Sequence, residues 1–176
     1  MNTVALSLGS NIDKERNLPE AIRLLREMTS TSSVISIAPI YETAPTGLLN
    51  QPNFFNTAVL MQTPLSAAEI KETIIAAIET KLNRVRQADK NAPRTIDIDI
   101  ALFNDGIFNY ELSDGSTRRV PDKDIMRFPH VAVPLADLLP DMPHPETGEL
   151  LSAIAANLLA ETEDGSIWQR PDIILG

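Results

Sequence analysis

Two aspartates, Asp97 and Asp99, lie two positions apart in the segment 94–103, which has the alternating pattern of a β-strand. Both are expected on one face of the strand, about 6 to 7 Å apart, where they repel each other by roughly 2 to 3 kcal/mol at an effective dielectric constant of ~20. A divalent cation such as Mg²⁺ would offset this repulsion, and the alternative is a pair of solvated aspartates on an open sheet face. The apolar residues that alternate with them are expected on the opposite face: Ile96, Ile98, Ile100 and Leu102.

A cluster of basic residues precedes this strand, in a chain whose formal net charge is -9. Guanidinium groups bind phosphate oxygens through paired hydrogen bonds, so arginines beside two aspartates indicate a metal-bound polyphosphate. A solvated run of surface charge is the alternative. The cluster contains one acidic residue, Asp89, and five basic ones: Lys81, Arg84, Arg86, Lys90 and Arg94.

Length and composition predict one globular domain over residues 1–176, with 43% hydrophobic residues to form its core. The absence of cysteine excludes disulfides, a zinc-thiolate site and a thiol nucleophile, and it fits a cytoplasmic protein. The chain enters its first strand directly, without a signal-peptide pattern, and no apolar run approaches the ~18 residues of a membrane span. The acidic balance argues against nucleic-acid binding.

The hydrophobic pattern predicts the element order strand, helix, strand, strand, helix, strand. The second helix has the clearest start, because Ser66 and Glu69 form a capping box and Leu65 and Ile70 form a hydrophobic staple. Its buried stripe is expected at Ile70, Ile74, Ile78 and Leu82. The other predicted elements are strands over 4–8, 32–42, 54–62 and 94–103, a helix that begins between 11 and 19 and ends at 29–30, a hairpin through 104–106 that ends near 112, and helices over 131–139 and 150–159.

This order is that of an α+β, ferredoxin-like split βαβ fold. It has an antiparallel sheet, helices on one face and extra C-terminal helices. In such a fold the outer face of the sheet stays open. Asp97 and Asp99 are expected on that open face, where ligands can also bind.

Six segments of the chain match one known family, in order, between residue 4 and about residue 140. They resemble the 6-hydroxymethyl-7,8-dihydropterin pyrophosphokinases of folate biosynthesis. The set is specific because it combines a Pro-Arg-Thr-x-Asp-x-Asp run with an earlier Phe-x-Asn. The segments are Leu8-Gly9-Ser10-Asn11, Tyr41-Glu42-Thr43-Ala44-Pro45, Gln51 to Val59, Arg84-Val85-Arg86, Pro93 to Asp99 and Val133-Pro134-Leu135.

The resemblance implies transfer of pyrophosphate from ATP to the hydroxymethyl group of the pterin, with release of AMP. Asp97 and Asp99 would hold two Mg²⁺ ions that bridge the triphosphate. Arg84, Arg86 and Arg94 would contact the ATP phosphates, and Arg84 and Arg94 would act with the two aspartates as the catalytic residues. Such a reaction mainly requires positioning and charge neutralisation.

The resemblance also implies a pterin site. Phe54 would stack on the pterin ring and Asn56 would hydrogen-bond to it, and period two places both on one sheet face. Thr43, Ala44 and Thr46 belong to the loop whose backbone would contact the edge of the pterin. The expected partners are ATP and a hydroxymethyl pterin, with the protein acting as a monomer and a weak homodimer as the alternative.

The chain departs from the family pattern after residue 120. Asp122 stands in place of the family's histidine, and Phe128 in place of its arginine. His130 replaces the second stacking aromatic residue, and it is expected either to cover the pterin or to be a packed ring. Lys123 and Arg127 would supply replacement charge at the phosphates. In addition, Asn91 lies where a loop tryptophan is common in the family.

Two further functions remain open at this point. One is a different Mg-nucleotide-dependent transferase that uses the Asp97 and Asp99 pair. The other is a non-catalytic, pterin-binding ferredoxin-like module. For the metal-site assignment, Asp97→Asn or Asp99→Asn is expected to abolish transfer and weaken Mg-ATP binding. Either substitution is expected to leave the metal-free fold intact or slightly more stable, because the repulsion between the aspartates is relieved.

Overall fold

The computed structural model describes residues 1–28, 32–89 and 91–175. The predicted helix end at 29–30 and Lys90 lie outside these residues. Strand β1 (Asn2–Ser10) is an inner strand of the main sheet. The strands are antiparallel to their neighbours in the order β5-β1-β4-β3-β8, and β2 also pairs with β4. The other strands are β2 (Ser33–Ile37), β3 (Tyr41–Thr43), β4 (Phe54–Thr63), β5 (Asp97–Phe103) and β8 (Ile167–Gln169).

The connections confirm the predicted ferredoxin-like order. Helix α1 (Lys14–Glu27) connects β1 to β2, and β4 lies between these two strands. The second helix connects β4 to β5, and β1 lies between those. The predicted strand 32–42 is divided into β2 and β3. Pro39 lies between them, and proline has no N–H to donate to β4.

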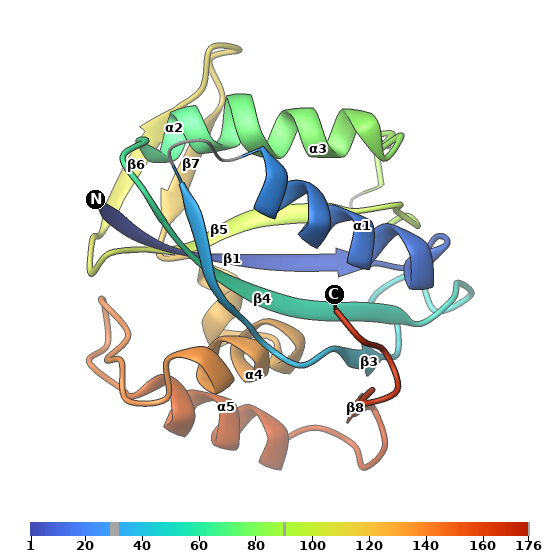
Figure 1. Cartoon of the computed structure of the whole chain (residues 1–176). Helices are drawn as coiled ribbons and strands as arrows, with labels where there is room; N and C mark the ends of the chain where they lie inside the picture. The colour runs from blue at the N-terminus through green and yellow to red at the C-terminus, as the bar shows by residue number, and fades with distance from the viewer. Residues whose placement is uncertain (29–31, 90, 176) are drawn as a thin grey trace.

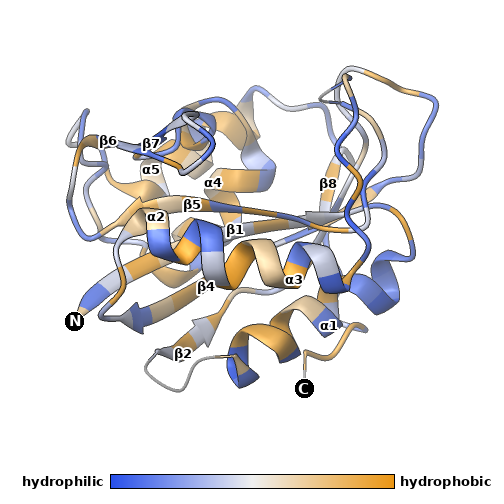
Figure 2. Cartoon of the chain, turned by 90° about the horizontal axis from the view of Figure 1, so that it is seen from above, coloured by the Kyte–Doolittle hydropathy of each residue, from blue (hydrophilic) through white to orange (hydrophobic). Residues whose placement is uncertain are grey.

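Both faces of the sheet carry helices, as Figure 1 shows. Helix α1 and the second helix pack on one face over β1, β4 and β5. Helices α4 (Pro129–Leu138) and α5 (Leu151–Ala160), the extra C-terminal helices, cover part of the other face. The expectation of an entirely open outer face was therefore wrong, although Asp97 and Asp99 on that face remain partly exposed. Figure 2 shows polar as well as apolar residues on α1 and α3, as in amphipathic helices.

A β-bulge corrects one face assignment in β5. The pairing of β1 with β5 shifts between Ala5 and Leu6, so that Ala101 is an extra residue. One extra residue reverses the alternation of side chains, so Leu102 joins the core under α4 and α5, and Phe103 joins the core under α1. The prediction that Leu102 shares a face with Ile100 was wrong for this reason. Asp97 and Asp99 precede the bulge, and their predicted positions are unaffected.

The second helix begins as predicted and then departs from α-helical geometry. Ser66 Oγ accepts from the N–H of Glu69, and the Glu69 carboxylate accepts from the N–H of Ser66, which confirms the capping box. The predicted apolar stripe is buried. The helix consists of α2 (Ala67–Glu69), the π-helical segment η1 (Ile70–Ile75) and α3 (Ala76–Lys81). A second buried row lies beside the stripe, at Lys71, Ile75 and Glu79.

The predicted hairpin from β5 through 104–106 was wrong. Strand β6 (Phe108–Glu111) pairs with β7 (Thr117–Val120) in a separate two-stranded sheet. Asn104 closes the end of β5 instead, because its N–H donates to Thr3 O at 2.7 Å and its Oδ1 accepts from the N–H of Thr3 at 2.8 Å. These bonds to β1 direct the chain away from β5. No helix among the described residues is long and apolar enough to cross a membrane.

Candidate active site

Three strand ends bring the two halves of the predicted site together around Gly9 of β1. Asn56 of β4 and Asp97 of β5 both lie opposite Gly9, which separates them by about 10 Å, two strand spacings. A Cβ atom at Gly9 would lie 3.1 Å from Asn56 Oδ1, so glycine leaves room for the Asn56 side chain. The predicted pterin and metal residues therefore share one face of the sheet.

The loop after β1 ties three loops of the site to one another. The N–H groups of Asn11 and Ile12 both donate to Arg94 O at 3.1 Å, and Asn11 Oδ1 accepts from the N–H of Arg94 at 2.8 Å. Asn11 Nδ2 donates to Gln51 Oε1 at 2.8 Å, and Gln51 Nε2 donates to Asn91 O at 2.8 Å. These bonds explain why polar residues follow β1 and precede β4. They also fix the backbone from which the Arg94 side chain extends.

Two arginines pair with Asp97. Arg94 Nη1 donates to Asp97 Oδ2 at 2.5 Å, and Arg84 Nη2 lies 3.8 Å from Asp97 Oδ1. The Arg84 side chain is 10% exposed, and burial lowers its pKa from the ordinary value while Asp97 opposes that change. Arg84 Nε is buried, and no described residue offers it a hydrogen-bond partner. Arg84 and Arg94, which the sequence placed at the phosphates, thus both meet the predicted metal ligand.

A buried lysine pairs with Asp99. Lys71 Nζ donates to Asp99 Oδ1 at 2.9 Å and to Ile98 O at 2.7 Å. Strand β5 is at the edge of the sheet, so no neighbouring strand can donate a hydrogen bond to the carbonyl groups on its outer side. The carbonyl of Ile98 therefore needs a donor from outside the sheet, and Lys71 supplies it. Lys71 comes from η1, on the face opposite the aspartates, and therefore reaches around this edge to Asp99.

These ion pairs change what is expected of the repulsion between Asp97 and Asp99. Within the described part of the chain, three cations pair with Asp97 and Asp99 and already offset the repulsion between them. A metal ion is therefore not needed to stabilise the fold. Replacing an aspartate would leave a partly buried cation without its partner, so the expected gain in stability without metal becomes an expected loss.

Glu79 adds a further buried carboxylate beside this cluster. Its Oε2 accepts from Arg86 at 3.0 Å, and its Oε1 is buried with no hydrogen-bond partner among residues 1–28, 32–89 and 91–175. Burial raises the pKa of Glu79, while Lys71 and Arg86 lower it. Arg86, which the sequence also placed at the phosphates, is 62% exposed and so accessible from solvent.

The aspartate pair fits Mg²⁺ that is held together with phosphates. The Asp99 side chain is 48% exposed and that of Asp97 is 25% exposed, so both are accessible. Over residues 1–28, 32–89 and 91–175 there is no cluster of three or more His, Cys, Asp or Glu side chains that could hold a metal ion. Mg²⁺ is commonly bound through one or two carboxylates, with phosphate oxygens and water completing its shell.

The predicted pterin residues lie next to these charges. Asn56 Nδ2 donates to Thr43 Oγ1 at 2.8 Å, and the Arg94 guanidinium lies 5.9 Å from the centre of the Phe54 ring. The N–H of Ala44 donates to Ser166 O, in the segment before β8. Thr46 is exposed in the following loop. Phe54, Asn56 and Thr43 are thus adjacent, whereas the N–H of Ala44 already has a partner.

The segment that departs from the family pattern forms the short 3₁₀ helix η2 (Lys123–Met126) and the start of α4. Asp122 caps η2, because its Oδ1 accepts from the N–H of Asp124 at 2.9 Å. Arg127 contacts Asp124 at 3.3 Å, and its guanidinium lies 5.1 Å from the centre of the Phe128 ring. Lys123 is exposed. Both candidate replacement charges therefore lie on the surface.

His130 stacks on Phe128, with ring centres 5.2 Å apart and an angle of 21° between the ring planes. Burial lowers the pKa of His130 to about 4, with the charge of Arg94 also lowering it and that of Asp124 opposing the change. The imidazole is therefore neutral at pH 7. A neutral, flat ring near Arg94 suits the predicted stacking role better than an imidazolium would.

Asp122 gives the protein a pH-dependent stability. Burial, with Asp99 and Asp124, raises the pKa of Asp122 to about 6 from an ordinary value of 3.8. Between about pH 4 and 6 the native state binds more protons than the unfolded state, so this group lowers the unfolding free energy as pH rises. We expect Asp122→Asn, which keeps the capping oxygen, to gain roughly 2 kcal/mol relative to the native chain between pH 4 and pH 7.5. Urea unfolding at both pH values measures this difference, and parallel pH profiles would contradict it.

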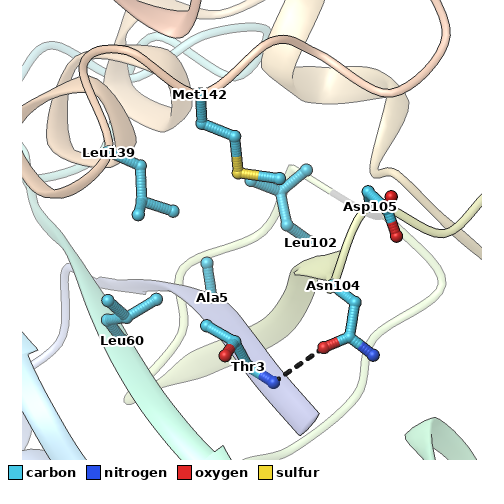
Figure 3. Close-up of a pocket in the computed structure, with 8 residues that line it drawn as sticks. All are labelled: Thr3, Ala5, Leu60, Leu102, Asn104, Asp105, Leu139 and Met142. Carbon is cyan, nitrogen blue, oxygen red and sulfur yellow. Dashed lines mark hydrogen bonds between the residues drawn. The ribbon is translucent and has the colours of Figure 1, made fainter.

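A separate hollow of about 300 Å³ lies at the far end of the sheet (Figure 3). Its walls are mainly apolar, and its rim includes the bonded pair Thr3 and Asn104. Thr3 is near the start of β1, whereas the aspartates and Asn56 lie opposite the end of β1. This hollow is therefore distinct from the candidate active site. The lining residues are Thr3, Ala5, Leu60, Leu102, Asn104, Asp105, Leu139 and Met142.

Comparison with known proteins shows the family of this chain. The family model described as 7,8-dihydro-6-hydroxymethylpterin-pyrophosphokinase matches residues 5–140. The chain belongs to this family. A 2-amino-4-hydroxy-6-hydroxymethyldihydropteridine pyrophosphokinase from Pseudomonas aeruginosa is 31% identical over 153 residues, which cover 87% of this chain and 90% of the relative. A pyrophosphokinase of the same name from Bacillus subtilis is 42% identical over 106 residues, covering 59% of this chain and 62% of the relative.

Solved structures confirm the fold of this pyrophosphokinase family member. Plasmodium falciparum HPPK-DHPS superposes on 96% of the chain with a TM-score of 0.72 and 12% sequence identity. The chain spans 48% of that longer protein, less than half of its length. The similarity therefore supports the ferredoxin-like architecture and its C-terminal helices.

Two charged residues of the site, Lys71 and Glu79, were missed from the sequence. They lie eight residues apart on the second helix, at i and i+8, beside the predicted apolar stripe. Their spacing places them on one helix face, which is the signal that could have identified them. Both are buried. Lys71 donates to Asp99 of β5, and Glu79 accepts from Arg86 of the basic cluster.

Proposed function

We propose that this chain transfers pyrophosphate from ATP to the hydroxymethyl group of 6-hydroxymethyl-7,8-dihydropterin, releasing AMP in folate biosynthesis. The observation that carries the proposal is the register at Gly9, which places Asn56 and Asp97 on one sheet face about two strand spacings apart. A flat ring near Phe54 and Asn56 thus lies within reach of a triphosphate near the aspartates. The membership of the family favours this function over another nucleotide-dependent transferase.

The residues of this chain would act mainly by positioning and charge. Asp97 and Asp99 would hold Mg²⁺, two ions by the family pattern, which neutralises charge on the triphosphate when bound. Arg84 and Arg94 would exchange Asp97 for phosphate oxygens, and Arg86 would bind phosphate from the solvent side. Phe54, Asn56 and the Thr43–Thr46 loop would orient the pterin, with His130 covering it. The hydroxymethyl oxygen then attacks the β-phosphorus of ATP, and AMP leaves.

The test is AMP release. Purified protein with ATP, Mg²⁺ and 6-hydroxymethyl-7,8-dihydropterin is expected to produce AMP and the pterin diphosphate in equal amounts. ATP without pterin is the control. Pterin binding without AMP release would instead support the non-catalytic pterin-binding module, and AMP release with no dependence on the pterin would support a different transferase.

The segment after residue 120, which departs from the family pattern, leads to a prediction about the charges near the phosphates. If Arg127 contacts phosphate in the transition state, Arg127→Ala is expected to cost on the order of 2 kcal/mol in transition-state stabilisation. Asp122→His removes negative charge and restores the residue of the family pattern, so it is expected to be neutral or to increase the rate. Steady-state kcat/KM of the two variants measures both effects. A third variant, Asp122→Ala, provides the contrary outcome. If it is inactive while Arg127→Ala has an unchanged kcat/KM, Asp122 is itself a metal or substrate ligand.

We propose a single domain over residues 1–176, which is supported by the pairing of the C-terminal strand β8 with β3 of the main sheet. We further propose a cytoplasmic monomer that binds no nucleic acid. Sedimentation equilibrium distinguishes the monomer from a weak homodimer.

A further inference from the structure

Lys71 is the cation of the site that the reaction described above does not use. Its side chain is 8% exposed, and it donates both to Asp99 Oδ1 and to the edge carbonyl of Ile98. A buried ammonium is costly unless it is paired and hydrogen-bonded, and Lys71 has both kinds of partner. The ammonium is therefore held against one oxygen of a proposed metal ligand.

The charge around the aspartates favours one kind of cation complex over another. Lys71 neutralises Asp99, while Arg84 and Arg94 neutralise Asp97. A bare divalent cation that enters this site is repelled by three positive charges and must compete with them for the carboxylates. ATP with one bound divalent cation still carries net negative charge, so the same three cations attract that complex.

The small number of carboxylates also favours binding of the metal together with phosphates. The described part of the chain offers a bare ion no set of three or more acidic or histidine side chains, so the protein alone completes few positions of its shell. The phosphates must supply several of the remaining ligands. Metal binding is therefore expected to depend on the nucleotide.

We propose that Lys71 is an internal counter-ion that keeps the site closed to free divalent cations, so that metal enters only together with a nucleotide polyphosphate. This inference rests on the proposed function, because it takes Asp97 and Asp99 as the metal ligands. Lys71 is a positioning residue here, since it acts through Asp99. Its bond to the Ile98 carbonyl is independent of Asp99 and retains the ammonium at the sheet edge when the metal complex takes the carboxylate.

The experiment measures Mn²⁺ binding, as MnCl₂ alone, by electron paramagnetic resonance, with and without a non-hydrolysable ATP analogue. The native chain is expected to bind Mn²⁺ at least tenfold more weakly without the analogue than with it. Lys71→Met keeps an apolar stem of similar length and removes the charge, so it is expected to bind Mn²⁺ alone at least fivefold more tightly than the native chain. Lys71→Gln tests the same change with a group that still donates to Ile98.

Arg23→Met is the matched control, because it also removes one positive charge, from an exposed ion pair on α1. It is expected to leave Mn²⁺ binding unchanged, and thermal melting verifies that each variant is folded. Unchanged or weaker Mn²⁺ binding in folded Lys71→Met and Lys71→Gln would show that Lys71 only supports the sheet edge and would overturn the proposal. If the native chain binds no Mn²⁺ even with the analogue, the proposed function itself fails, which is a distinguishable result.

Discussion

Replacing Asp97 or Asp99 with asparagine is expected to lower kcat/KM for AMP release by about 10³-fold or more, which corresponds to ~4 kcal/mol of transition-state stabilisation. Each substitution removes a carboxylate charge from a site that has only two such ligands on β5. Metal bound with ATP would then lose one of its protein ligands. Steady-state AMP release and Mg-ATP binding by calorimetry measure the two effects, and near-normal turnover in either variant would contradict the metal assignment.

The same variants are expected to be less stable, not more stable, without metal. Asp97→Asn leaves Arg84 and Arg94 without their carboxylate, and Asp99→Asn leaves the buried Lys71 with a neutral partner. A loss of about 1 to 3 kcal/mol in unfolding free energy follows from the uncompensated charge. Asp105→Asn is the matched control, because Asp105 is exposed beyond the other end of β5. A gain in stability would show that aspartate repulsion outweighs the three ion pairs.

Shortening the two pterin residues is expected to weaken pterin binding by about 1 to 3 kcal/mol each, with little change in the affinity for ATP alone. Phe54→Ala removes the stacking face, and Asn56→Ala leaves hydrogen-bonding groups of the pterin without partners. Asn56→Ala also removes the bond to Thr43 Oγ1, so the position of β3 is part of the effect. Calorimetry with the pterin and with the ATP analogue separates the two affinities.

Two further variants serve as controls for the pterin site. Phe54→Tyr preserves an aromatic face and is expected to retain most of the affinity. Asn109→Ala removes an exposed asparagine from β6, outside the main sheet, and is expected to have no effect. Unaltered pterin binding in both Phe54→Ala and Asn56→Ala would refute the assignment of this pocket.

The sequence by itself predicted the element order and most of the site strands. Period-two alternation placed Asp97 with Asp99 and Phe54 with Asn56, because a strand repeats every two residues whatever surrounds it. The capping box at Ser66 and Glu69 is also a local interaction, and it forms as predicted. Segment matches then identified the family, which the family model confirms.

The tertiary structure alone decided which charges meet the aspartates. Lys71 is 28 residues from Asp99 along the chain. Their contact forms because the helix that carries Lys71 packs on the sheet beside its edge strand, β5. The bulge at Ala101 and the separation of the β6-β7 hairpin likewise depend on pairing with β1, through bonds such as that of Asn104 to Thr3. Local patterns specify the face and the spacing of residues within one element. The partners across elements, and with them the charge balance of the site, follow from packing between residues distant in sequence.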